Sequence, residues 1–377
     1  MISCQNEKIS EPVEKHFSRK GYITMNSKER VMRAIQRQEI DRVPLDITYT
    51  SQPNFDRIKT ALNMNGKSNE ELFRTLGLDT WWIFNPLIYV GEKRYFNGEE
   101  ADYLGITPSI YAGTAGDSNS TGPLKGVSTV EEVERYPWPS IDDFDGSQLD
   151  RILDEHRDFA IIGGVWAPIF HQVAWLCGIE DTYANLILNP EVVEALIRHV
   201  TDFWVAYTHK VLQIAKGRID IIENCNDFGG QHGLIISVDS FRKFMKPALK
   251  RLYDTIKEYD VKVFQHSCGA IAPIIPDFIE IGADILNPVQ VSAKGMNPEV
   301  LKAKFGDKLT FCGGIDTQKV LPFGSEEEVR AEVRRMIGIM GKGGGYILAG
   351  SQALEEDIPV ENILAMFDEA KRCPVNL

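Results

Sequence analysis

The sequence lacks any run of about 20 apolar residues, the length that a helix needs to cross a bilayer. Its most apolar windows, such as residues 159–165, have the length of a strand. The first 24 residues are polar and contain no apolar segment of the kind that a secretory signal requires. We therefore expect no membrane span and no export by that route, and we predict a cytoplasmic location.

Cysteine and positive charge are both scarce. Six cysteines in 377 residues form no disulfide framework, fit a reducing compartment and leave metal binding or catalysis as roles for some of them. The 41 Lys and Arg residues are outnumbered by 54 Asp and Glu, so the net charge of -13 repels nucleic acids and anionic membranes. With 43% hydrophobic and 25% charged residues, the composition is that of a globular protein with a small-molecule rather than a nucleic-acid or membrane partner.

Short β-rich segments recur along the chain, and most are followed by a segment with helical periodicity, which is the pattern of parallel strands with crossover helices. There are eight: 43–48, 80–84, 159–165, 219–223, 261–266, 283–287, 308–312 and 346–350. Eight is the number that closes a barrel, although an open doubly wound sheet has a similar pattern. We predict an α/β fold with a single (β/α)8 TIM barrel over residues 26–377.

Three further features complete this prediction. Residues 1–25 are expected to form a flexible tail, and Asn26 to cap an N-terminal helical extension that begins with residues 27–38. Residues 85–157 are rich in Gly, Ser and Thr and contain Pro137 and Pro139, so they suit a long insertion after the second strand, near the barrel mouth.

Candidate metal ligands stand where two of these strands end. Catalytic groups of a (β/α)8 barrel come from the carboxyl ends of its strands. His266 and Cys268 end the fifth strand, and Cys312 ends the seventh, which predicts three ligands for Zn²⁺ with one open position. The alternative is that these are ordinary buried side chains, since cysteine is among the most commonly buried residues.

Other polar side chains follow the same strand ends. Glu223 is the most plausible fourth, displaceable zinc ligand, because an oxygen donor exchanges with an incoming thiol. Cys225, just after the fourth strand, is interpreted as a bystander thiol, with a further zinc ligand as the alternative. The remaining candidates are predicted to bind substrate, with a solvated loop or internal hydrogen bonds as the alternative; they are Asp46, Asn226, Gln231, Asn287 and Gln290.

The predicted ligand set favours one kind of chemistry. Two thiolates and a neutral imidazole leave the zinc site formally uncharged, so the metal is a weak Lewis acid. Such a site binds a substrate thiol, lowers its pKa below the free value near 8.5 and presents it as a nucleophile for alkyl transfer.

Three segments, QHSCGAIAPIIPDFIEIGADILNPVQ, LTFCGGIDTQKVLPFG and GGGYILAGSQALEEDIPVENI, resemble the uroporphyrinogen decarboxylase superfamily. The resemblance runs from about Ser27 to the last helix and implies a (β/α)8 barrel. The superfamily contains cofactor-free decarboxylases and corrinoid-dependent methyltransferases, and the zinc motif of the latter, His-x-Cys and a distant Cys, matches His266, Cys268 and Cys312. Asp227 resembles one of an acidic pair after the fourth strand, which implies a catalytic role beside Glu223, although Asn226 replaces the first acid.

The resemblance is closer to the methyltransferases of the methylcobamide:coenzyme M type. True decarboxylases carry an Arg-rich signature of the form MRQAGRY, whereas the corresponding region here reads DRVPLDITYTSQ, with no Lys or Arg between Arg42 and Arg57. The resemblance therefore implies a zinc-dependent enzyme that moves a methyl group between methylcobalamin, or a protein-bound corrinoid, and a thiol or another small acceptor or donor. The alternatives are a tetrapyrrole decarboxylase and a non-catalytic barrel that binds a corrinoid protein.

Overall fold

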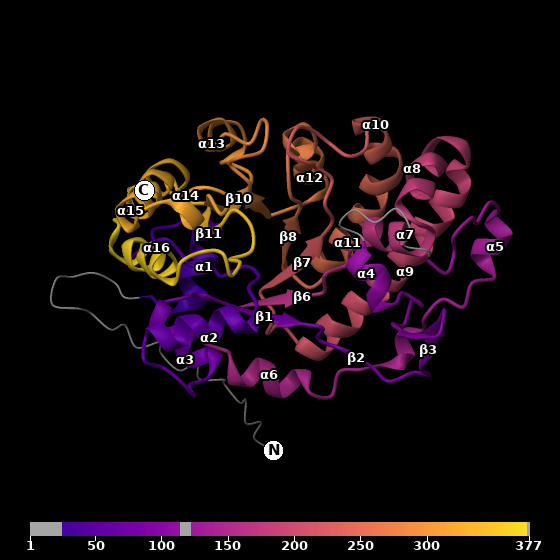
Figure 1. Ribbon diagram of the computed structural model, residues 1–377, viewed down its shortest axis with the longest axis horizontal. Coiled ribbons are helices and arrows are strands. Elements are labelled where there is room, and N and C mark those ends of the chain that lie inside the picture. The colour runs from indigo at the N-terminus through magenta and orange to yellow at the C-terminus, as the bar shows by residue number, and fades with distance from the viewer. Residues whose placement is uncertain (1–24, 114–121, 375–377) are drawn as a thin grey trace, which may run out of the picture.

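The structure is a computed structural model that describes residues 25–113 and 122–374. Its centre is a curled, half-barrel sheet of seven parallel strands with helices around it (Figure 1). In spatial order the strands are β1 (Thr80–Phe84), β6 (Ala160–Gly164), β7 (Ile221–Cys225), β8 (Lys262–His266), β9 (Ile285–Val289), β10 (Thr310–Ile315) and β11 (Tyr346–Gly350). These are seven of the eight predicted strands, within three residues at each end. The predicted tail lies outside the described residues apart from Met25.

The helices alternate with these strands as predicted, and further short elements fill the excursion between β1 and β6. The helices are α1 (Ser27–Ile35), α2 (Gln52–Ala61), α3 (Asn69–Leu76), α4 (Pro108–Gly113), α5 (Val130–Glu134), α6 (Leu149–Glu155), α7 (Ile169–Cys177), α8 (Ile179–Leu188), α9 (Pro190–Ala215), α10 (Val238–Ser240), α11 (Lys246–Lys257), α12 (Ile275–Ile281), α13 (Pro298–Phe305), α14 (Val320–Phe323), α15 (Glu326–Met340) and α16 (Val360–Arg372). Two antiparallel pairs lie in the excursion, β2 (Ile88–Tyr89) with β5 (Phe144–Asp145) and β3 (Arg94–Phe96) with β4 (Glu99–Ala101). Figure 1 shows the excursion carrying β3 and α5 to the side of the molecule opposite α16.

The first predicted strand, residues 43–48, is not formed, so the prediction of a complete eight-stranded barrel is corrected. The segment makes one isolated bridge, between Leu45 and Leu348 of β11, and its only backbone bond toward β1 runs from Asp79 N–H to the Leu45 carbonyl. A ladder fails here for two reasons. Pro44 has no N–H to donate, and the N–H of Leu45 donates to the Asp79 carboxylate at 2.9 Å instead of to a strand carbonyl.

Helix α1 covers the inner face of the sheet at its amino end. Asn26 caps this helix as predicted, because its side chain accepts from the N–H of Glu29 at 2.7 Å. Val31 and Ile35 of α1 join an apolar layer with inward-facing residues of the strands, namely Ala160, Ile162, Ile221, Phe264, Ile285, Cys312, Ile347 and Ala349. Side chains alternate along a strand, so Glu223 and His266, two residues beyond Ile221 and Phe264, lie on the same inner face and nearer the carboxyl end.

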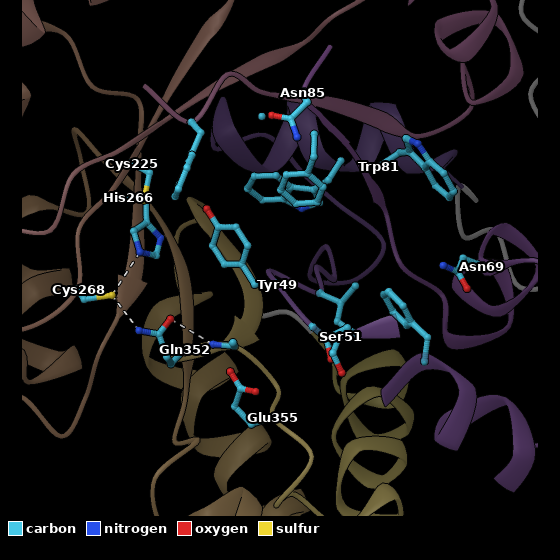
Figure 2. Close-up of a pocket in the computed structure, with 18 of the residues that line it drawn as sticks. Tyr49, Ser51, Asn69, Trp81, Asn85, Cys225, His266, Cys268, Gln352 and Glu355 are labelled. Carbon is cyan, nitrogen blue, oxygen red and sulfur yellow. Dashed lines mark hydrogen bonds between the residues drawn. The ribbon is translucent and has the colours of Figure 1, made fainter. Parts of the chain in front are cut away.

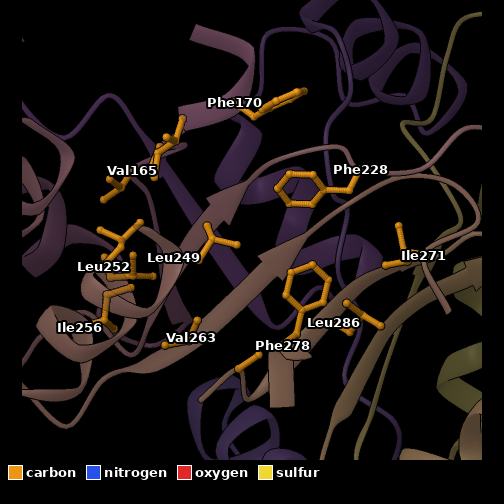
Figure 3. Close-up of a cluster of buried hydrophobic side chains, with 14 of the residues drawn as sticks. Val165, Phe170, Phe228, Leu249, Leu252, Ile256, Val263, Ile271, Phe278 and Leu286 are labelled. Atoms are coloured by element: carbon orange, nitrogen blue, oxygen red, sulfur yellow. The ribbon is translucent and has the colours of Figure 1, made fainter. Parts of the chain in front are cut away.

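The outer face of the sheet is covered by the longer helices. Leu249, Leu252 and Ile256 of α11 pack with Val263 of β8, and Phe278 of α12 packs nearby with Phe228 (Figure 3). These side chains are buried, and truncating one such leucine to alanine costs about 2–5 kcal/mol of stability. The strand ends are thus fixed between two apolar layers.

No helix among residues 25–113 and 122–374 is both long and apolar enough to cross a membrane.

Candidate functional site

Five potential metal ligands gather at the carboxyl ends of β7 and β8. The two strands pair in parallel with Cys225 opposite His266, so the residues that end them are neighbours. These residues form two groups of three, and within each group the ligand atoms lie within 4.8 Å of one another. Glu223, Cys225 and His266 form one group, and Asp227, His266 and Cys268 form the other. His266 is common to both, so it is the centre of the cluster.

The ring of His266 is held in one orientation. Its Nδ1 lies 2.6 Å from Oδ1 of Asn287, an acceptor, so Nδ1 carries the proton. Its Nε2 faces Sγ of Cys268 at 3.3 Å and Oδ1 of Asp227 at 3.5 Å, so its lone pair is available to a metal ion when Nε2 carries no proton. A fixed Nδ1–H bond of this kind is the usual support of a metal-binding histidine.

The loop after β8 is held by residues that follow β7 and β9. The N–H of Cys268 donates to Oδ1 of Asp227 at 2.8 Å, and the N–H of Gly269 donates to Oε1 of Gln290 at 2.7 Å. Gly269 has a φ of +84°, and a Cβ there would lie 2.2 Å from the Gly229 carbonyl oxygen, so only glycine allows the two loops to pack this closely.

The carboxylate of Glu223 is fully buried, and only one of its two oxygens has a hydrogen-bond partner. The Tyr49 hydroxyl donates to its Oε1, while its Oε2 has no hydrogen-bond partner. Burial raises the pKa of Glu223 to about 7, against the opposing effects of His266 and the Tyr49 hydrogen bond. An unpartnered buried carboxylate oxygen is costly, which points to a proton or a cation at this position.

Charge on the other donors depends on their neighbours. Burial alone would raise the pKa of Asp227, but His266 and His171 outweigh it, and the pKa falls below its ordinary value. Burial raises the pKa of the Cys225 and Cys268 thiols, and the nearby carboxylates raise it further. Both thiols are therefore protonated in this structure at neutral pH, and a divalent cation among them would favour the thiolates.

Cys312 does not join this cluster, and the ligand set of His266, Cys268 and Cys312 stays a prediction. Among the described residues, Cys312 belongs to no group of three donors within 4.8 Å of one another. It lies in the inner apolar layer, fully buried, with its Sγ 4.0 Å from Oδ2 of Asp46.

The predicted substrate-binding residues are placed behind the site rather than in it. Asp46 accepts from Thr48, Thr80 and the Trp82 indole, and Asn287 holds His266. The side chain of Asn226 bonds to the backbone of Ala167 and Phe170, and Gln231 and Gln290 bond to loop backbone. These hydrogen bonds agree with the alternative of internal hydrogen bonding, and a role in substrate binding stays a prediction.

A pocket of about 970 Å³ opens beside the cluster. His266, Cys268 and Asp227 line its inner end, and Tyr49, Trp82 and Phe84 line its side. Figure 2 shows Cys268 between His266 and Gln352, whose Nε2 lies 2.8 Å from Sγ of Cys268. Tyr49 and Gln352 were not predicted, because each comes from a loop far from the His-x-Cys motif in sequence. Cys225 was interpreted as a bystander, yet its pairing with His266 brings it to the cluster.

Known proteins resemble this chain along most of its length. The family model described as uroporphyrinogen decarboxylase (URO-D) matches residues 127–373. A methylcobamide:CoM methyltransferase, MtbA, from Methanosarcina acetivorans is 23% identical over 358 residues, which cover 91% of this chain and 97% of that protein. A uroporphyrinogen decarboxylase from Chromohalobacter salexigens is 22% identical over 366 residues, covering 90% and 96% of the two chains.

The fold is shared with a solved structure. A methyltransferase from Methanosarcina mazei superposes with a TM-score of 0.62 at 17% identity, covering 93% of this chain and 99% of that one. At this identity the likeness concerns the fold alone.

Proposed function

The chain belongs to the uroporphyrinogen decarboxylase family, and from this premise we propose that it is a zinc-dependent methyltransferase that moves a methyl group between a corrinoid and a small molecule. The observation that carries the proposal is the donor group of Asp227, His266 and Cys268 at the inner end of the pocket. The similarity to MtbA methyltransferases over nearly the whole chain supports it.

The residues present fit a zinc ion. Imidazole nitrogen, thiolate sulfur and carboxylate oxygen are the three donor types that zinc uses in proteins. His266, Cys268 and Asp227 would hold it, with Glu223 and Cys225 on the other side of His266 as further donors. The unpartnered Oε2 of Glu223 is the kind of buried oxygen that such a cation satisfies.

Zinc at this position would act as a Lewis acid on the heteroatom that carries or receives the methyl group. The chain's own residues keep the donors in place: Asn287 fixes the tautomer of His266, and Asp227 and Gln290 hold the backbone of the Cys268 loop. Tyr49 orients Glu223, and its ring lines the pocket together with Trp82 and Phe84.

The two alternatives have less support. A tetrapyrrole decarboxylase must bind many carboxylates, but no described residue that lines the pocket is a lysine or arginine. A barrel that only docks a corrinoid protein would have no use for a cluster of buried donors with an unsatisfied carboxylate, which is costly to maintain.

Two measurements on the purified full chain test the proposal. Metal analysis should find about one zinc per chain, removable by a chelator and restored by added zinc. Methyl transfer is followed by absorbance in both directions, from methylcobalamin to a panel of acceptors and from a panel of methyl donors to reduced cobalamin. We expect transfer that is lost when the metal is removed. Equal turnover without zinc would contradict the metal's role, and decarboxylation of uroporphyrinogen would contradict the reaction class.

A further inference from the structure

We propose that Gln352 protects the sulfur of Cys268 from methylation by donating an amide hydrogen bond to it, so that Cys268 stays a metal ligand. This inference rests on the proposed function and adds a residue that regulates the reactivity of the same site. Gln352 is a positioning residue in this role, because its effect reaches the reaction through Cys268. The contact is direct, since Nε2 of Gln352 lies 2.8 Å from Sγ of Cys268 (Figure 2).

A methyltransferase that holds its metal with cysteine has a side reaction of its own. The thiolate is the nucleophilic form of cysteine, and a bound metal keeps the thiol deprotonated. Cys268 lines the pocket in which the methyl group would be transferred. A lone pair on its sulfur would form a bond to the methyl carbon while the carrier of the methyl group keeps the electron pair of the bond that breaks. The product is a neutral thioether, which is not among the ligands that zinc uses in proteins.

The sulfur of Cys268 has two nitrogen neighbours, and a bound metal leaves one of them as a donor. Nε2 of His266 lies 3.3 Å from Sγ. Metal coordination uses the lone pair of this nitrogen while Nδ1 keeps the proton that it donates to Asn287, so His266 then has no N–H for the sulfur. The amide nitrogen of Gln352 carries two N–H groups and has no lone pair free for a metal, so it remains the donor.

The backbone on both sides of Gln352 is fixed. The N–H of Ser351 donates to the carbonyl of Ile315, at the end of β10, at 2.7 Å. The N–H of Leu354 donates to the carbonyl of Tyr49 at 3.2 Å. Ser351 and Leu354 are both buried. Gln352 is therefore held in place just beyond the carboxyl end of β11, before any metal or reactant is bound.

The amide group of Gln352 is oriented as well as placed. Its Oε1 accepts from the N–H of Ala353 at 3.2 Å, which leaves Nε2 to face Cys268 (Figure 2). The reverse orientation would set two acceptors, Oε1 and a thiolate sulfur, against each other. Gly350 permits this close turn, because a Cβ there would lie 2.7 Å from the carbonyl oxygen of Gln352.

A hydrogen bond to a metal-bound thiolate lowers its reactivity and keeps it as a ligand. The N–H draws electron density from the sulfur, and contacts of this kind tune metal ligands from outside the coordination sphere. The nucleophilicity of a thiolate falls as its basicity falls. The lone pair that accepts the hydrogen bond must also give it up before it attacks carbon. Hydrogen bonds to charged acceptors are stronger than those between neutral groups, so this loss raises the barrier to methylation.

The test uses the full chain loaded with zinc, with methyl iodide as the methylating probe. The sulfur lone pair of Cys268 forms a bond to the methyl carbon as the carbon–iodine bond breaks, and iodide leaves with the electron pair. Peptide mass spectrometry over time gives the rate of methylation of Cys268. Cys373, a partly buried thiol outside the pocket, is the reference within each sample. Metal analysis before the reaction establishes that all samples contain equal zinc.

Two variants separate the hydrogen bond from the bulk of the side chain. Gln352→Met removes the donor and keeps the length of the side chain, and we expect Cys268 to be methylated about tenfold faster than in the parent. Gln352→Ala also removes the bulk and should react at least as fast. Gln318→Met, at an exposed glutamine outside the pocket, is the matched control and should leave the rate unchanged.

Cobalt(II) in place of zinc provides a readout that a merely structural role would not move. The charge-transfer band from the thiolate sulfur to cobalt reports the energy of the sulfur lone pair. Loss of the N–H donor raises that energy, so the band should shift to longer wavelength in Gln352→Met. It should keep its position in Gln318→Met.

The outcomes separate this inference from the proposed function. Equal methylation rates and equal cobalt spectra in the parent and Gln352→Met would overturn the inference and leave the metal site intact. Faster methylation in Gln352→Ala but not in Gln352→Met would show that bulk protects the sulfur, which also overturns it. A parent protein that binds neither zinc nor cobalt would contradict the proposed function itself, and the metal analysis reveals this before any methylation.

Discussion

His266 donates a hydrogen bond from Nδ1 to Oδ1 of Asn287 at 2.6 Å, and this contact decides which ring nitrogen faces the donor cluster. Asn287→Ala should therefore weaken zinc binding by about 10- to 100-fold, because the ring loses the partner that fixes its tautomer and orientation. The measurement is a zinc titration against a competing chelator.

Asn287→Asp is the matched control, since a carboxylate also accepts from Nδ1 and is a common partner of metal-binding histidine. It should bind zinc more tightly than Asn287→Ala. Equal affinities in the two variants would show that the hydrogen bond does not support the site.

Two cysteine variants distinguish the observed donor group from the ligand set that the sequence suggested. Cys268→Ser should lose most of the zinc, because its Sγ lies 3.3 Å from Nε2 of His266. Cys312→Ser should keep it, but should lower the free energy of unfolding by about 1–3 kcal/mol, because a hydroxyl replaces a thiol in the apolar layer.

Metal analysis and thermal unfolding of both variants give the answer. If Cys312→Ser lost zinc while remaining folded, Cys312 would be a ligand and the cluster of Asp227, His266 and Cys268 would have to rearrange on binding.

Sequence patterns predicted most of the sheet because its strands are covered on both faces. Runs such as residues 80–84 and 346–350 are apolar or nearly so throughout, and they coincide with β1 and β11. The first strand failed because a distant carboxylate, Asp79, takes the N–H of Leu45, and no local pattern reveals such a contact.

The site was predictable only where it is local. His266 and Cys268 are two residues apart, and their shared position at a strand end follows from the sequence. The position of Cys312 relative to them depends on strand order and on an irregular register between β9 and β10 at Phe311 and Gly313. Tyr49 reaches Glu223 across 174 residues of chain, which no spacing rule anticipates.

A buried ion-pair network should contribute strongly to stability. Nη1 of Arg30, in α1, lies 2.6 Å from Oδ1 of Asp79, whose side chain is fully buried and also binds Arg42. Asp79→Ala should lower the free energy of unfolding by on the order of 3 kcal/mol, because Arg30 and Arg42 lose a shared buried carboxylate, the N–H of Leu45 loses its acceptor, and Arg30 keeps only its pair with Asp41. Urea unfolding measures the change.

The exposed pair of Arg74 and Glu70 is the control for this prediction. Glu70→Ala should cost less than about 1 kcal/mol, since surface ion pairs contribute little. A small loss in Asp79→Ala as well would mean that Asp41 alone compensates the charge of Arg30.

The raised pKa of Glu223 makes the stability of the metal-free protein depend on pH. The folded protein holds this proton up to a pKa of about 7, whereas the unfolded chain releases it near the ordinary value of about 4.3. Between these values the folded state binds more protons than the unfolded state, so the contribution to stability falls as pH rises. This contribution is unchanged below about pH 4. Its loss is complete above about pH 7, where the loss reaches on the order of 3 kcal/mol.

Glu223→Gln, which cannot ionise, should therefore be more stable relative to the parent at pH 8 than at pH 4, as measured by urea unfolding in the presence of a chelator. The same difference at both pH values would show that Glu223 is ionised in the folded protein without metal, and saturating zinc should reduce the difference by stabilising the charged carboxylate.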